Sequence, residues 1–162
     1  MEENKFNNVY KEFASNIFRY IYFKVSDYDV AADLTADTFT RFWKVSVREP
    51  IDNAKAFLFS IANGIIIDYY RKKKKQKKVS LDVIDEWLLG VIDKNEDVLS
   101  NKQEITYIFL KLKKLKKTYQ DILLLYYVEE LKVEEISLVL HKTENNTRVI
   151  LHRALQALKK LL

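Results

Sequence analysis

The chain is poor in the residues that several kinds of fold and active site require. It has no Cys and only 2 His, which excludes disulfides, thiolate metal sites and Cys nucleophiles and leaves almost no room for a multi-His zinc site. Its 2 Gly and 1 Pro are too few for the turns of a many-stranded sheet fold. The longest apolar stretches, such as Ile122 to Val128, are far shorter than the roughly 18 residues of a membrane span, and the acidic start MEENKF is unlike a secretion signal. We therefore expect a soluble, cytoplasmic, all-α protein with no metal, no cofactor and no membrane insertion.

Composition and charge predict two folded units rather than one. Hydrophobic residues make up 48% of the 162 residues and charged residues 31%, which excludes global disorder. The net charge of +5 is uneven, because residues 71–78 carry seven basic and no acidic side chains, whereas residues 79–101 carry six acidic and one basic. This change of sign indicates a border between units. The basic block and the basic C-terminal half are candidate surfaces for a polyanion, although the Lys run alone is also typical of a solvated segment.

Apolar spacing of three and four predicts three helices in the N-terminal half. The first carries the stripe Phe6, Tyr10, Phe13, Ile17, Tyr20 and Ile21. A turn at Ser26 to Asp29 precedes a second helix from about Val30 to Lys44, whose inner face holds Ala31, Thr38, Phe39 and Phe42. Asp52 or Asn53 is the expected N-cap of a third helix from Ala54. Its core stripe is Leu58, Ile61, Ala62, Ile65 and Tyr69, which leaves Phe59, Asn63, Ile67, Tyr70 and Arg71 on the opposite side.

Helical spacing returns after the acidic segment, within which a short helix near Leu81 to Leu89 is expected. Ile105, Ile108, Phe109, Leu112 and Leu115 line one helix, and Ile122 to Val128 form the buried centre of the next. A short helix at Val133 to Leu140, a tight turn at His141 to Thr143 and a longer helix at Glu144 to Leu162 make a helix-turn-helix.

The outer face of the last helix fits the major groove of DNA. The N-terminal residues of such a helix contact base edges and its basic residues contact phosphates. Asn145, Asn146 and Arg148 lie at that end, and Val149 could contact a thymine methyl group. The competing interpretation is an ordinary amphipathic helix with a solvated polar side.

Two stretches together resemble a bacterial RNA polymerase sigma factor of the extracytoplasmic-function (ECF) type in the sigma-70 family. AADLTADTFTRFWK (Ala31 to Lys44) with AFLFSIANGIIIDYYRKKKK (Ala56 to Lys75) resembles region 2, and the stretch from Tyr119 to Leu162 resembles region 4. The resemblance implies two small helical domains, at residues 1–78 and 102–162, joined by a basic-then-acidic linker at 79–101 that would lie near the RNA exit path.

The resemblance also implies sites. In the family, region 2 binds the clamp coiled coil of the polymerase and the minus-10 promoter element, and region 4 reads the minus-35 element and touches the polymerase flap. The expected polymerase-binding residues are Asp33, Asp37, Thr40, Arg41 and Lys44. The expected minus-10 residues are Phe59, Asn63, Gly64, Ile67, Tyr70, Arg71, Lys72 and Lys73, with residues 45–56 beside Asn63 and Gly64 forming a pocket for a flipped base. Burial of Phe59 against the first helix is equally compatible with the sequence. The expected minus-35 residues are Thr143, Asn145, Asn146, Arg148, Val149, His152 and Arg153.

Several positions depart from the family pattern. Ala36 and Asp37 stand where the family favours Gln and Glu, Phe57 where it favours Trp, and Asn63 and Gly64 where Arg and Asn are common. In region 4, Lys116 replaces a frequent Pro, Glu130 and His141 replace frequent Gly residues, and Ile150 replaces a frequent Arg. His tolerates the left-handed conformation better than branched residues do, so the turn can survive.

No catalytic constellation accompanies these motifs, because the close acids Asp33 and Asp37 lie on an outer helix face beside no nucleophile or metal ligand. The resemblance therefore implies a non-enzymatic sigma factor that binds core RNA polymerase and promoter DNA. Two alternatives remain: a helix-turn-helix regulator that binds duplex DNA without polymerase, and a sigma-like accessory protein unable to open promoters. Sigma factors of this type are commonly held inactive by an anti-sigma factor, and the residues identify none.

Overall fold

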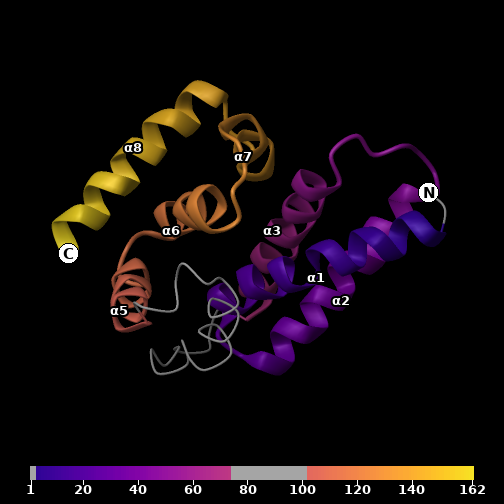
Figure 1. The fold of residues 1–162 in the computed structure, drawn as a ribbon, viewed down its shortest axis with the longest axis horizontal. Coiled ribbons are helices and arrows are strands. Elements are labelled where there is room, and N and C mark those ends of the chain that lie inside the picture. Colours follow the sequence, from indigo (N-terminus) through magenta and orange to yellow (C-terminus); the bar gives the residue numbers. More distant parts are fainter. Residues whose placement is uncertain (1–2, 74–101) are drawn as a thin grey trace. The chain divides into compact units, whose positions relative to one another are not determined.

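A computed structural model describes residues 3–73 and 102–162 of the chain, except for the side chains of Lys102 and Ile105. All regular elements of these residues are helical, as the sequence predicts (Figure 1). The chain divides into two units, Met1–Val79 and Ser80–Leu162. The acidic segment at 79–101, its expected short helix and the end of the Lys run lie outside the described residues.

The first unit is a bundle of three helices, each of which packs on the other two: α1 (Glu3–Val25), α2 (Tyr28–Ser46) and α3 (Ala54–Lys72). Side-chain caps fix where two of them begin. The Asp27 carboxylate accepts a hydrogen bond from the Val30 N–H (3.1 Å), and the Asn53 side chain accepts one from the Ala56 N–H (3.0 Å). The cap expected at residue 52 or 53 is thus Asn53, and α2 begins two residues earlier than its hydrophobic spacing indicates.

Burial in this unit increases along α1. The predicted stripe is correct at Ile17, Tyr20 and Ile21, which are at most 1% exposed, whereas Tyr10 near the start of the helix is 47% exposed. Residues 20–25 are all buried, because this end of α1 contacts both neighbouring helices: Tyr20 meets Phe59 of α3, and Tyr22 meets Tyr28 of α2. The predicted inner face of α2 is also buried.

The prediction for α3 is wrong at Asn63, which is only 7% exposed. Of the two alternatives that the sequence leaves open for Phe59, the structure has the buried one, at 0% exposure. The Phe59 ring meets the Tyr20 ring edge-on, with centroids 5.4 Å apart. Because α1 and α2 both cover α3, two faces of this helix are buried, whereas a single-stripe helical wheel assumes only one.

The C-terminal end of α3 is tied to the C-terminal end of α1. The Tyr70 hydroxyl donates a hydrogen bond to the Lys24 carbonyl oxygen, which satisfies a carbonyl of the last helical turn. Burial, with a smaller contribution from neighbouring Tyr69, raises the pKa of Tyr70 to about 12.

The second unit contains α5 (Lys102–Leu112), α6 (Lys117–Leu123), the π-helix η3 (Leu124–Val128), α7 (Val133–Leu140) and α8 (Glu144–Leu161). In this unit α8 packs on α5, α6 and α7. The expected buried centre at 122–128 is correct for the first four residues and wrong for Tyr126 and Tyr127, which are 36% and 54% exposed. The π-turn, closed by the Glu129 N–H to the Leu124 carbonyl (2.9 Å), shifts the helical phase and turns both rings outward.

The turn between α7 and α8 forms as the sequence predicts. His141 adopts the left-handed conformation (φ 56°, ψ 48°) that ends α7. The Thr143 hydroxyl then accepts a hydrogen bond from the Asn146 N–H (3.0 Å) and begins α8. One left-handed residue and one capping hydrogen bond, within six residues, therefore fix the direction in which α8 leaves α7.

The left-handed turn gives a stability prediction. We expect His141→Gly to stabilise the second unit by about 0.5 to 1 kcal/mol, because Gly adopts φ above zero without the steric cost that a Cβ imposes. Leu138→Gly is the control: Leu138 lies inside α7 and is 68% exposed, so Gly should destabilise there by about 1 kcal/mol. Urea unfolding followed by circular dichroism measures both. A destabilised His141→Gly variant would contradict the strain argument.

The raised pKa of Tyr70 gives a pH prediction. A folded-state pKa above the ordinary value of 10.0 means that the neutral phenol is favoured in the fold, so its stabilisation is complete below pH 10 and is lost as the pH rises toward 12. At pH 7 we expect Tyr70→Phe to be less stable than the native chain by about 1 kcal/mol, the net contribution of one hydrogen bond. That difference should shrink between pH 10 and 12 in thermal melts. A constant difference across this range would mean that the hydroxyl has the same pKa in the folded and unfolded states.

Candidate nucleic-acid and protein interfaces

The face of α2 that the sequence predicts to bind a protein is largely exposed. Asp33, Thr40, Arg41 and Lys44 are exposed and Asp37 is half-buried. Arg41 pairs with Asp37 at 3.2 Å, and their side chains are 51% and 42% exposed. Such an exposed pair contributes only about 0.3 to 0.5 kcal/mol, so a partner can exchange it at little cost. The Thr40 hydroxyl donates a hydrogen bond to the Ala36 carbonyl (2.9 Å).

The residues expected at the minus-10 element separate into two groups. Phe59 and Asn63 belong to the core and do not reach the surface, as described above. Gly64, Ile67, Arg71 and Lys72 are exposed, and Tyr70 and Lys73 are half-buried. The structure thus places Gly64, Ile67 and Arg71 on one exposed strip of α3. A Cβ at Gly64 would meet nothing within 4 Å, so packing within the unit does not require glycine at this position.

The sequence predicts Tyr69 in the core stripe, but its side chain is half-buried and contacts Lys73 at the basic C-terminal end of α3. The Lys73 ammonium group donates a hydrogen bond to the Tyr69 hydroxyl (2.9 Å) and lies 5.2 Å from the centroid of the ring. This hydrogen bond is the main cause that raises the pKa of Lys73. Arg71 pairs with Asp68 at 3.5 Å. The i, i+4 spacing of Tyr69 and Lys73 was the available sequence signal for this contact.

The loop between α2 and α3 forms a cleft of about 470 Å³. The sequence predicts a pocket formed by residues 45–56 together with Asn63 and Gly64, but neither Asn63 nor Gly64 lines this cleft. The lining residues are Lys5, Ser46, Val47, Arg48, Glu49, Pro50 and Ile51. Sequence reasoning missed Lys5, because only the packing of α1 along α2 brings it to this loop.

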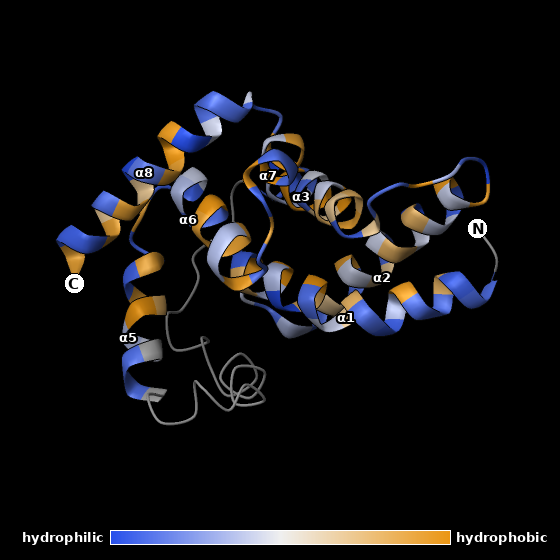
Figure 2. Cartoon of the chain, turned by 45° about the horizontal axis from the view of Figure 1, so that its top comes forward, coloured by the Kyte–Doolittle hydropathy of each residue, from blue (hydrophilic) through white to orange (hydrophobic). Residues whose placement is uncertain are grey.

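The outer face of α8 presents nearly all the residues predicted to contact DNA. Asn145, Asn146, Arg148, Val149, His152 and Arg153 are exposed, with Val149 at 39%, and hydrophilic and hydrophobic residues occupy different sides of the helix (Figure 2). The exposed Thr143 caps the helix. Thr147 and Ala154 on the opposite side are completely buried.

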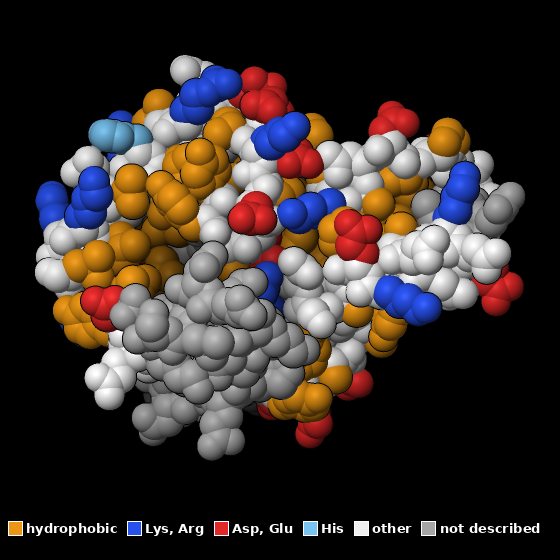
Figure 3. Space-filling model, viewed as in Figure 1, with side chains coloured by type: hydrophobic (Ala, Val, Ile, Leu, Met, Phe, Trp, Pro, Cys, Tyr) orange, Lys and Arg blue, Asp and Glu red, His pale blue; other side chains and the backbone are white. Residues whose placement is uncertain are grey.

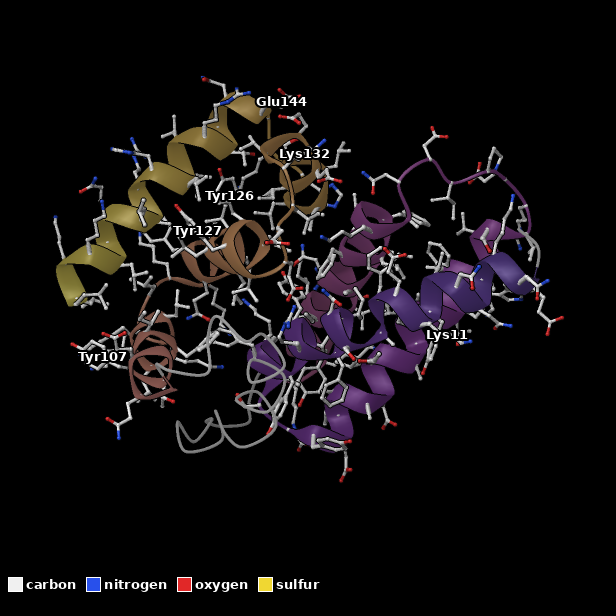
Figure 4. All side chains as sticks on the ribbon, in the orientation of Figure 1. Lys11, Tyr107, Tyr126, Tyr127, Lys132 and Glu144 are labelled. Carbon is white, nitrogen blue, oxygen red and sulfur yellow. The ribbon has the colours of Figure 1, made fainter. Side chains whose placement is uncertain are left out.

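The first turn of α8 also carries an acid, Glu144, beside these residues. Glu144 lies at the start of α8 (Figure 4), and its carboxylate is 3.5 Å from the Arg148 guanidinium. Both side chains are about half exposed, at 52% and 56%. The i, i+4 spacing of Glu144 and Arg148 was the signal that could have identified the pair.

Aromatic rings gather on another surface of the second unit. Tyr107 is 46% exposed and Ile108 37%, in addition to Tyr126 and Tyr127. The Tyr126 and Tyr127 rings lie edge-to-face with centroids 4.9 Å apart (Figure 4), and hydrophobic side chains gather on the same face in the space-filling view (Figure 3). Lys111 lies 5.0 Å from the Tyr107 ring centroid. The sequence places Ile108 on an inner stripe, but of the described side chains of that stripe only Phe109 and Leu112 are buried.

The described residues contain no group of three or more His, Asp or Glu side chains that could hold a metal ion. Within the same residues, no helix is long and apolar enough to cross a bilayer.

Comparison with known proteins gives matches to both units. The family model described as "Sigma-70 region 2" matches residues 9–76, and that described as "Sigma-70, region 4" matches residues 107–158. The ECF RNA polymerase sigma factor SigM of Bacillus subtilis (strain 168) is 28% identical over 155 residues, which cover 96% of this chain and 93% of SigM. The RNA polymerase sigma factor YlaC of the same strain is 26% identical over 154 residues, which cover 94% and 89%.

Among solved structures, a chain of the RsbN–BldN complex matches at 21% identity and a TM-score of 0.38, covering 99% of this chain and 94% of that chain. The two sequence models lie in the order of the sigma regions, and the relatives are matched along nearly their whole length. The chain therefore belongs to the sigma-70 family as an ECF sigma factor, a non-enzymatic protein that directs RNA polymerase to promoters.

Proposed function

We propose that the region 2 unit binds core RNA polymerase through α2 and the minus-10 element through α3, while the region 4 unit reads the minus-35 element through α8. The observation that carries this proposal is the outer face of α8. A helix that begins at a capped turn and exposes two Asn, two Arg and one His has the donors and acceptors that base edges and phosphates require.

The polymerase contact rests on Asp33, Asp37, Thr40, Arg41 and Lys44 of α2. Their helix is fixed from behind by the buried residues Ala31, Phe39 and Phe42. A basic partner helix would gain two carboxylates here and would have to displace only one weak internal pair.

The minus-10 contact rests on the exposed strip of α3 and on the loop cleft. Ile67, at 47% exposure, offers an apolar contact for an unstacked base, and Arg71 and Lys72 follow at the cationic end of the helix. Lys5 and Arg48 outnumber the single acid Glu49 in the lining of the loop cleft, and this excess of positive charge suits the phosphates on either side of a flipped base. Phe59 and Asn63 act in this proposal only by holding α3 in place.

The exposed aromatic surface of the region 4 unit supports a protein partner there. Exposed rings in a π-helical segment are a common feature of functional surfaces. The polymerase flap is the partner that the family resemblance implies, and an anti-sigma factor that covered Tyr126 and Tyr127 would compete with it. Because its work is done on RNA polymerase, we expect the protein to act in the cytoplasm.

Reversal of charge on α2 tests the polymerase contact. We expect Asp37→Lys to abolish co-elution with core polymerase on a sizing column, because the new cation would face a basic partner. The fold should persist, since the lost pair with Arg41 contributes only about 0.5 kcal/mol. Glu12→Lys, an exposed change on α1, is the matched control and should leave co-elution unchanged. Wild-type yield of the Asp37→Lys complex would remove this face from the interface.

Removal of Arg148 tests the minus-35 contact. We expect Arg148→Ala to weaken promoter binding of the holoenzyme by about 1 to 3 kcal/mol if the guanidinium reads a guanine, and to relax selectivity at that base pair. Binding to core polymerase should not change. Lys159→Ala, on the exposed far end of α8, should at most weaken binding equally for all sequences. Measurement uses gel-shift titration against single-base promoter variants, and unchanged selectivity would exclude Arg148 as a reader.

A further inference from the structure

A second cleft lies between the first turns of α1 and the middle of α2. Its volume is about 510 Å³, and its lining residues are Glu3, Phe6, Asn7, Tyr10, Ala36, Phe39, Thr40 and Trp43. Four of these are aromatic. The cleft explains why the hydrophobic stripe of α1 remains incompletely buried at this end, where Tyr10 is 47% exposed.

The aromatic rings are held in fixed mutual orientations. Phe6 and Trp43 meet edge-to-face at 5.0 Å between centroids, and Tyr10 and Phe39 do so at 4.9 Å. Phe6 also contacts the ring of Phe39 at 6.5 Å. Ring faces carry negative electrostatic potential, so a group of aromatic side chains lining one cleft favours a cationic occupant.

The charges of the cleft point to the same kind of occupant. Among the residues that the structure describes, Glu3 is the only charged one in the lining, and no Lys or Arg of the described ranges lines the cleft. Asn7 and the Thr40 hydroxyl add polar groups but no positive charge. A cationic side chain that entered would therefore meet aromatic rings and one carboxylate.

The cleft adjoins the acidic face of α2. Thr40 belongs to both surfaces, and Ala36 in the lining directly precedes Asp37 on the acidic face. A partner helix that placed basic residues against Asp33 and Asp37 would thus bring neighbouring side chains to the mouth of the cleft. Ala36 is small, and a longer side chain at this position on α2 would project into the opening.

We propose that this cleft receives a Lys or Arg side chain from the same polymerase surface that contacts the acidic face of α2. This inference rests on the proposed polymerase contact and adds to it a specificity pocket formed by Trp43, Phe6 and Glu3. Ala36 keeps the pocket open.

Paired substitutions test the cationic character of the occupant. We expect Trp43→Leu to weaken binding to core polymerase about three- to tenfold, the effect of losing one cation–π contact, while Trp43→Phe retains most of the affinity. Glu3→Gln should weaken binding and lower its dependence on salt. Affinities are measured by competition against fluorescently labelled native protein for core polymerase, and thermal melts establish that each variant is folded.

A second pair tests whether the cleft itself is occupied. Ala36→Gln should fill the mouth and weaken binding by a similar factor, whereas Ala32→Gln, an exposed change one turn earlier on α2, should have no effect. If Ala36→Gln leaves binding unchanged or strengthens it, the pocket is not used. If Trp43→Leu binds as well as Trp43→Phe, the occupant is apolar and the cationic assignment is wrong.

The outcomes separate this inference from the proposal on which it rests. Full binding by Asp37→Lys would remove the α2 face from the interface, and the pocket with it. Loss of binding by Asp37→Lys with unchanged binding by Ala36→Gln and Trp43→Leu would overturn the pocket alone. Sedimentation of the free protein adds a further check, because self-association that Trp43→Leu abolishes would identify a second copy of the chain as the occupant instead.

Discussion

The region 2 unit depends on the burial of α3 against two helices at once. Phe59 packs edge-on against Tyr20, and Tyr70 bonds the last turn of α1, so α3 is held at its middle and at its end. This arrangement leaves only a narrow strip of α3 at the surface. It also fixes α2 from behind, so that its acidic face points outward. Both proposed interfaces of the unit therefore follow from one packing constraint, and a cavity at Phe59 would disturb both, because buried aromatic side chains contribute several kcal/mol each.

The region 4 unit depends instead on backbone geometry at its connections. His141 and Glu130 both adopt positive φ, at positions where the family often has glycine. The residues that bracket these turns compensate locally: the Glu135 carboxylate accepts a hydrogen bond from the Lys132 N–H (2.8 Å), and Thr143 caps α8. Strain at two residues is thus offset by caps at the helices that follow. The direction of α8, and with it the DNA-facing residues, is set by these few bonds together with the burial of Thr147 and Ala154.

A common electrostatic feature links the proposed interfaces. Arg41, Arg71 and Arg148 each pair with an acid three or four residues earlier in the same helix. These pairs are exposed, so they add little to stability and are screened by salt. They hold the guanidinium groups near the helix surface without burying them. A polymerase carboxylate or a DNA phosphate can then replace the internal partner at low cost, which suits a subunit that must bind and release.

The sequence by itself determined the family, the helices and most of the exposed face of α8, because helical spacing and turn residues are local signals. It also identified the left-handed turn at His141. Tertiary structure decided the rest: that Phe59 and Asn63 are core residues, that Tyr126 and Tyr127 are exposed, and that Lys5 joins the loop cleft. The physical reason is that helical periodicity indicates one buried face per helix, whereas α3 buries two. The π-turn at Tyr126 and Tyr127 shifts the helical phase, which a regular period does not predict. The loop cleft is lined by residues that are distant in sequence, so only the folded chain brings them together.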